Sequence, residues 1–136
     1  MWERFSSKRQ NPELGLFLVR IALALVFIAH GWQKFQNLSG TVAFFDSIGL
    51  SALVAYFVAT VELLSGLAML AGIYTRWAGL LLAITMAVAI LVVKANMGLV
   101  GGYELEVTLL LCSLAMVAAY PRSYGFADWF QKRKSS

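Results

Sequence analysis

The chain has 136 residues, of which 60% are hydrophobic and 13% are charged, and its formal net charge is +4. Soluble domains are usually about 45–50% apolar and about 25% charged, so the composition excludes an ordinary soluble domain. It indicates one integral membrane domain over residues 1–136, with basic residues placed in loops and no nucleic-acid partner. The single cysteine, Cys112, excludes an internal disulfide, and we expect it to be a small packing residue.

The first apolar stretch, from Leu14 to Phe35, is long enough to cross a bilayer. It contains Arg20, and it carries His30 and Lys34 at its far end. A lone guanidinium in hydrocarbon is strongly unfavourable. We therefore expect Arg20 to face a partner from a later segment.

A short helix is predicted after this first span. Residues 36–40 break the apolar pattern, and from Thr41 to Ile48 the apolar side chains share one helical face. Such a helix lies at the membrane interface or caps the helices that cross it.

Three further spans complete the predicted fold, an all-α transmembrane four-helix bundle. The four spans are expected at about residues 14–35, 51–73, 77–94 and 103–120. The turn at 72–76 is tight, so spans two and three are expected to be antiparallel neighbours. The fourth span needs Glu104 and Glu106 in its first turn to reach the length of a crossing.

The distribution of basic residues predicts the orientation. They gather before the first span, in the 72–76 turn and in the C-terminal tail, whereas the opposite side holds only Lys34 and Lys94. Both termini are therefore expected in the cytoplasm. The cytoplasmic basic residues are Arg4, Lys8, Arg9, Arg76, Arg122, Lys132, Arg133 and Lys134.

Glu62, near the middle of the second span, is the predicted partner of Arg20. It shares a helical face with Ala55, Ala59 and Gly66, and small residues mark the packed side of a helix in lipid. Counted from the cytoplasmic ends of their spans, the two charged residues come within reach of each other. We predict a structural Arg20–Glu62 ion pair inside the bundle.

A second polar group is predicted at the outer end of the bundle. His30, Lys34, Lys94 and Glu104 are expected to converge there around a cavity, with His30, Lys34 and Glu104 as candidates for proton exchange. Lys94, Glu106 and Trp32 are candidate ligand contacts; Glu106 lies on a different helix face from Glu104.

Each group also has a purely structural interpretation. The inner pair could serve only to fix helix register, and Lys34 and Lys94 could extend to the headgroups. A metal site is disfavoured, because carboxylates at i and i+2 diverge on a helix.

Taken in order, these residues resemble those of the DoxX family of small four-helix membrane proteins. The likeness covers nearly the whole chain and is closest to a branch labelled as catechol- or quinone-related oxidoreductases. It rests on Arg20, His30-Gly31-x-x-Lys34-Phe35, Gly40-Thr41 with Phe44-Phe45, Ile48-Gly49-Leu50, Glu62 with Gly66, Gly72-x-x-Thr75-Arg76, Lys94 and Gly102-x-Glu104-x-Glu106.

The resemblance implies a protein of the bacterial inner membrane that is linked to quinone redox chemistry. Quinone is the implied cofactor, and the implied partners are the lipid bilayer, a redox partner protein and further copies of the chain. Two alternatives remain open: a carrier or channel for a small solute or proton, and a non-catalytic scaffold subunit.

Overall fold

The computed structural model describes residues 10–119 and 125–135, and these residues form a series of helices. Four helical stretches are long and apolar enough to cross a membrane: Pro12–Gln36, Ala52–Ala71, Thr75–Lys94 and Leu99–Ala119. The predicted all-α fold with four spans and a short helix after the first is confirmed. The elements are α2 (Pro12–Gln36), α3 (Leu38–Ser47), α4 (Ala52–Ala71), α5 (Thr75–Val88), η1 (Ala89–Lys94), η2 (Leu99–Tyr103), α6 (Glu104–Ala119) and α7 (Phe126–Lys134).

Asparagine side chains begin the first two of these helices. The Asn11 side chain accepts a hydrogen bond from the backbone N–H of Leu14, with Pro12 in the first turn of α2. Asn37 closes α2 and caps α3, because its Oδ1 accepts from the N–H of Gly40 at 3.1 Å. The short helix therefore begins at Leu38, earlier than the expected Thr41, because one residue ends one helix and starts the next.

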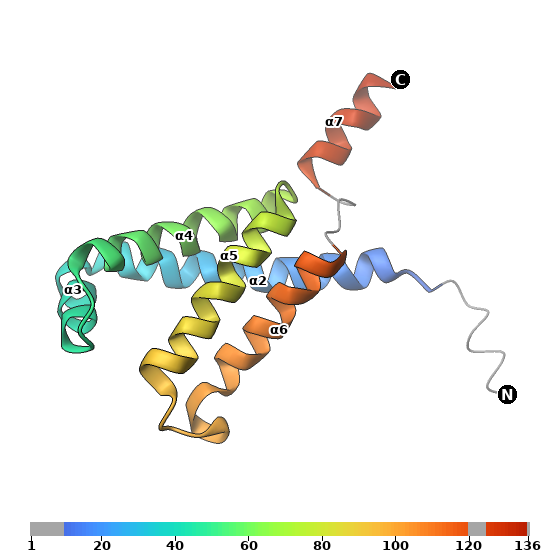
Figure 1. Ribbon diagram of the computed structural model, residues 1–136. Coiled ribbons are helices and arrows are strands. Elements are labelled where there is room, and N and C mark those ends of the chain that lie inside the picture. The colour runs from blue at the N-terminus through green and yellow to red at the C-terminus, as the bar shows by residue number, and fades with distance from the viewer. Residues whose placement is uncertain (1–9, 120–124, 136) are drawn as a thin grey trace, which may run out of the picture.

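The spans form two antiparallel pairs. Helix α2 lies alongside α4, and α5 lies alongside α6 (Figure 1). The pairs are joined by the turn after α4, where Gly72 and Tyr74 both adopt left-handed backbone conformations. From this turn the two pairs diverge toward the end of the molecule that holds α3 (Figure 1).

Glycines bring the two helices of each pair close together. A Cβ atom added at Gly31 would lie 2.8 Å from the backbone nitrogen of Leu63, and one at Gly66 would lie 2.9 Å from that of Ile28. In the second pair, a Cβ atom at Gly79 would lie 2.8 Å from the carbonyl oxygen of Ser113. Van der Waals contact through small residues is a main source of helix association in lipid.

The contacts of α2 with α4 also fix their relative register. Gly31 faces Leu63, and the guanidinium of Arg20 faces Gly72, the residue that caps the C-terminus of α4. The first residues of α2, from Pro12 to Val19, therefore extend about 12 Å beyond the end of α4 at 1.5 Å per residue. Figure 1 shows this overhang at the N-terminal side of the molecule.

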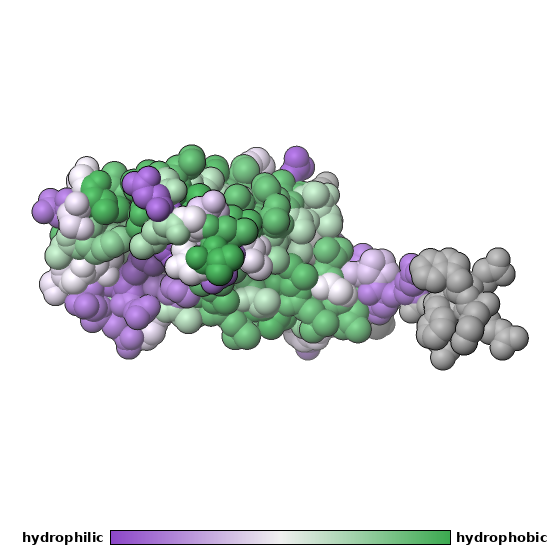
Figure 2. Space-filling model, turned by 90° about the horizontal axis from the view of Figure 1, so that it is seen from below, coloured by the Kyte–Doolittle hydropathy of each residue, from purple (hydrophilic) through white to green (hydrophobic). Residues whose placement is uncertain are grey.

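The core lies where the two pairs touch, and apolar side chains also cover much of the outside. Leu23, Phe27, Met69, Leu82 and Met116 are almost completely buried in one cluster. In Figure 2 the central body is largely hydrophobic on the face shown, and hydrophilic residues gather toward its ends. An apolar outer surface of this kind faces lipid in a membrane protein.

We expect reporter fusions to test the predicted orientation. Fusions after Asn37 or Gly98 should report the external side, and fusions after Tyr74 or at the C-terminus should report the cytoplasm. The measurement is the activity of a reporter that works on one side of the membrane only, and a cytoplasmic Gly98 would contradict the orientation. The basic residues Arg4, Lys8, Arg9 and Arg122, and the expected end of the fourth span at Tyr120, lie outside the described residues.

Candidate functional site: a cavity between the two helix pairs

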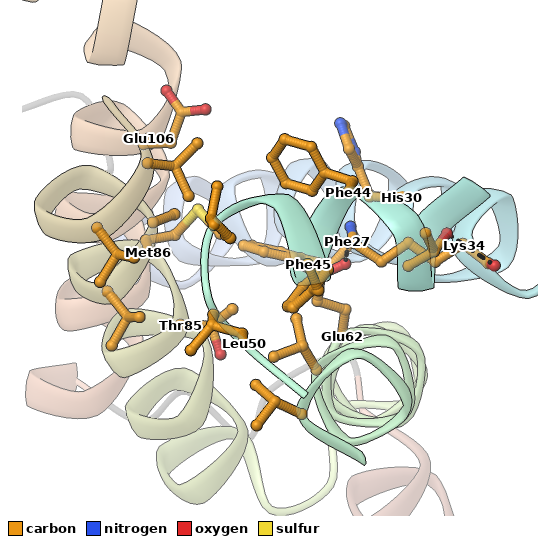
Figure 3. Close-up of a pocket in the computed structure, with 18 of the residues that line it drawn as sticks. Phe27, His30, Lys34, Phe44, Phe45, Leu50, Glu62, Thr85, Met86 and Glu106 are labelled. Atoms are coloured by element: carbon orange, nitrogen blue, oxygen red, sulfur yellow. Dashed lines mark hydrogen bonds and ion pairs between the residues drawn. The ribbon is translucent and has the colours of Figure 1, made fainter. Parts of the chain in front are cut away.

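The divergence of the two helix pairs creates a cavity of about 640 Å³. The second half of α2 and the first half of α4 form one wall. The end of α5 with η1 and the start of α6 form the opposite wall, and α3 lies between the two (Figure 3). Pockets that enclose small organic ligands usually measure about 300–1,000 Å³, so a ring-sized molecule fits.

The cavity walls are mainly apolar. Phe27, Phe45, Met86 and Leu109 line it and are themselves buried. Phe44, which is half exposed, meets Phe45 edge to face, with ring centroids 5.9 Å apart. The sequence predicted a polar cavity. The cavity is instead mainly apolar, and the charged side chains in its walls pair with each other in two ion pairs.

The first ion pair joins α2 to α4. Lys34 Nζ lies 2.7 Å from Glu62 Oε2, and the Glu62 side chain is only 6% exposed (Figure 3). Both residues line the cavity. The predicted Arg20–Glu62 pair is therefore wrong, since the partner that Glu62 contacts is Lys34.

Arg20 lies far from Glu62, at the C-terminal end of α4. Its side chain is completely buried against Gly72, and its guanidinium carbon lies 5.2 Å from the centroid of the Phe17 ring. The C-terminus of a helix carries unsatisfied carbonyls and a partial negative charge, which favour a cation. The prediction failed because it assumed that the cytoplasmic ends of α2 and α4 lie at the same depth in the membrane. The N-terminal part of α2 instead extends beyond α4, which places Arg20 about 15 Å from Glu62 along the helix axis.

The second ion pair joins the end of η1 to the start of α6. Lys94 Nζ lies 2.6 Å from Glu106 Oε1, and it also donates to the carbonyl oxygen of Gly102 at 3.4 Å. Lys94 and Glu106 line the cavity. The π-helical segment η1 has one more residue in each hydrogen-bonded turn than an α-helix, which changes the direction in which Lys94 points.

Glu104, the carboxylate that the sequence favoured, is not among the residues that line the cavity. It is exposed, and its Oε1 accepts a hydrogen bond from the N–H of Gly101 at 3.3 Å. This contact supports the turn before α6, where Gly101 has a φ of +73°. Glu106, ranked second from the sequence, takes the place at the cavity that was expected for Glu104.

The other two candidate residues of α2 differ in position. His30 lines the cavity, and its Nδ1 lies 2.8 Å from the carbonyl oxygen of Val26. A carbonyl can only accept, so Nδ1 carries the hydrogen in this contact and Nε2 remains available as an acceptor in the neutral ring. Trp32 is 56% exposed and is not among the lining residues, so its expected ligand contact is not seen.

Sequence reasoning missed α3 and Thr85 as parts of the site. α3 forms part of the cavity through Phe44 and Phe45, which the sequence had assigned to a helix that lies at the membrane interface or caps the bundle. Thr85 brings a hydroxyl group into the wall; it donates to the carbonyl oxygen of Leu81 at 2.8 Å and keeps its lone pairs as acceptors. The signal available for Thr85 was a lone hydroxyl residue within an apolar span.

The chain is similar in sequence to a known family and to two named proteins. The model of the family described as DoxX matches residues 15–95. A Bacillus subtilis protein named "Putative oxidoreductase CatD" is 40% identical over 124 residues, covering 91% of this chain and 92% of that protein. The Escherichia coli "Inner membrane protein YqjF" is 31% identical over 75 residues, covering 55% of this chain and 58% of that protein. No solved structure matches the chain.

Proposed function

The chain belongs to the DoxX family of membrane proteins, and we propose that it serves quinone-linked redox chemistry by holding a quinone ring in the cavity between its helix pairs. The Bacillus subtilis relative, similar over nearly its whole length, is named as an oxidoreductase. The relative named as an inner membrane protein supports the same membrane for this chain.

The observation that carries the proposal is an apolar cavity with a few hydrogen-bonding groups, formed by helices that cross the membrane. A quinone is a flat apolar ring with carbonyl oxygens that accept hydrogen bonds. The cavity of about 640 Å³ has aromatic and aliphatic walls, and its lining includes Lys34 and Lys94, whose ammonium groups are hydrogen-bond donors. These residues fit a quinone headgroup in size and in chemistry.

A bound quinone would supply the two-electron, two-proton redox change, and the protein would supply position and hydrogen bonds. One histidine and one cysteine in the whole sequence provide neither bis-histidine haem ligation nor an iron–sulfur ligand set. The proposed function therefore includes a flavin or a redox partner protein as the source or acceptor of electrons.

Menadione binding tests the proposal. We expect protein in lipid nanodiscs to bind menadione above the level of empty nanodiscs in equilibrium dialysis. Lys94→Met should weaken this binding about tenfold, because it removes a charged hydrogen-bond donor from the cavity. Glu104→Gln is the matched control, since Glu104 is exposed and outside the cavity. Natively purified protein that carries no quinone and does not bind menadione would contradict the proposal.

A carrier for protons or a small solute is the second candidate function. It is favoured by the presence of two ion pairs, Lys34–Glu62 and Lys94–Glu106, in the walls of one intramembrane cavity. A flux assay in liposomes discriminates between the two, because a quinone-binding subunit alone should leave the proton permeability of the liposomes unchanged.

A further inference from the structure

Building on the proposed quinone site, we propose that Glu106 accepts a hydrogen bond from a ring hydroxyl, so that the cavity prefers the reduced hydroquinone to the oxidised quinone. Glu106 thereby becomes a specificity-determining residue. The argument rests on the two oxygens of its carboxylate, which differ in their surroundings.

One carboxylate oxygen of Glu106 has a partner and the other does not. Oε1 lies 2.6 Å from Lys94 Nζ. Oε2 is buried, and within the described residues it has no hydrogen-bond partner. Buried polar atoms in proteins are almost always hydrogen-bonded, and an unsatisfied one is costly. Glu106 lines the cavity, so a ligand that comes into contact with its carboxylate can supply the missing donor.

The charge of Glu106 decides which ligand can satisfy it. Glu106 forms an ion pair with the Lys94 ammonium, and in this pair its carboxylate is the anion. An ionised carboxylate only accepts hydrogen bonds, so its partner must carry an O–H or N–H group. The two oxygens of a quinone are acceptors and would repel Oε2, whereas the hydroxyl groups of a hydroquinone can donate to it.

The chain around Glu106 holds this acceptor in place. Lys94 ends the π-helical segment η1, and such segments are frequent at functional sites. The carbonyl oxygen of Gly102 accepts a second hydrogen bond from Lys94. Gly102 itself packs tightly, because a Cβ atom there would lie 2.9 Å from the Cβ of Met97. The carboxylate is therefore positioned before a ligand enters.

The test compares menadiol with menadione on the unmodified protein in nanodiscs, with menadiol kept reduced under anaerobic conditions. We expect menadiol to bind at least about ten times more tightly than menadione, which is the difference expected for one hydrogen bond to a charged acceptor. This comparison depends on no variant. Binding of neither probe would overturn both the proposed function and the present inference, whereas equal binding of both would overturn the present inference alone.

Glu106→Gln identifies the residue responsible. The amide keeps the shape of the side chain but offers an N–H₂ donor, which suits a quinone carbonyl. Menadiol binding should therefore weaken about tenfold, while menadione binding should hold or improve. Glu104→Gln, which changes an exposed carboxylate outside the cavity, should keep the preference for menadiol. An equal loss of both probes in Glu106→Gln would contradict the assignment.

Discussion

Replacing Lys34 by methionine is expected to lower the free energy of unfolding by about 3–5 kcal/mol. The substitution leaves the Glu62 carboxylate, whose side chain is 6% exposed, without its cation inside the α2–α4 pair. An uncompensated buried charge is far more costly than the loss of a surface ion pair. The loss can be measured as a shift of the unfolding midpoint when the purified protein is titrated with denaturing detergent.

Two further variants test whether the pair itself is responsible. Lys34→Met combined with Glu62→Met should be more stable than Lys34→Met alone, since it leaves no buried charge. Lys94→Met should cost less than Lys34→Met, because the Lys94–Glu106 pair is more exposed, at 31% and 13% against 24% and 6%. A double variant as unstable as the sum of its two single changes would show that Lys34 and Glu62 are not coupled.

Gly31→Ala is expected to lower the stability of the α2–α4 pair by about 1–3 kcal/mol. The added methyl group would lie 2.8 Å from the backbone nitrogen of Leu63, and a backbone cannot move aside as a side chain can. Both helices must therefore shift apart, and the contacts that hold them in lipid weaken. Unfolding by denaturing detergent gives the measurement.

Gly15→Ala is the matched control on the same helix. A Cβ atom at Gly15 would meet nothing within 4 Å, so this change should be neutral or stabilising by up to about 1 kcal/mol, the difference in helix propensity. If both alanine variants behaved alike, the close approach of α2 and α4 would not depend on Gly31.

The number and type of the spans followed from the sequence because lipid imposes a simple rule. A segment that crosses the bilayer must form its backbone hydrogen bonds within a helix, and that helix needs about 20 mainly apolar residues. This pattern is visible in the sequence without any knowledge of packing. The short helix was also found, but not its start, because the Asn37 cap lies within a segment that the apolar pattern treats as an interruption.

To predict which charged side chains pair, one must know the register between the helices, and the hydrophobic pattern does not contain that information. Gly31 and Gly66 fix that register through backbone contact, and it brings Glu62 to Lys34 instead of Arg20. Likewise, the choice between Glu104 and Glu106 depended on the π-helical turn before Lys94. Local irregularities of this kind depend on tertiary contacts and have no periodic signal in the sequence.

The overhang of α2 bears on how the protein fits the thickness of a bilayer. With 25 residues, α2 is about 37 Å long, whereas α4, with 20, is about 30 Å, close to the hydrocarbon thickness. Leu14 and Leu18 in the overhang are 45% and 59% exposed, so burying them in lipid requires α2 to tilt, the usual response to hydrophobic mismatch. Tight glycine contacts make α4 tilt with it. The spans Thr75–Lys94 and Leu99–Ala119, with 20 and 21 residues, have no such excess length and do not need this tilt. Because one pair tilts and the other does not, the divergence of the two pairs lets both fit the same bilayer.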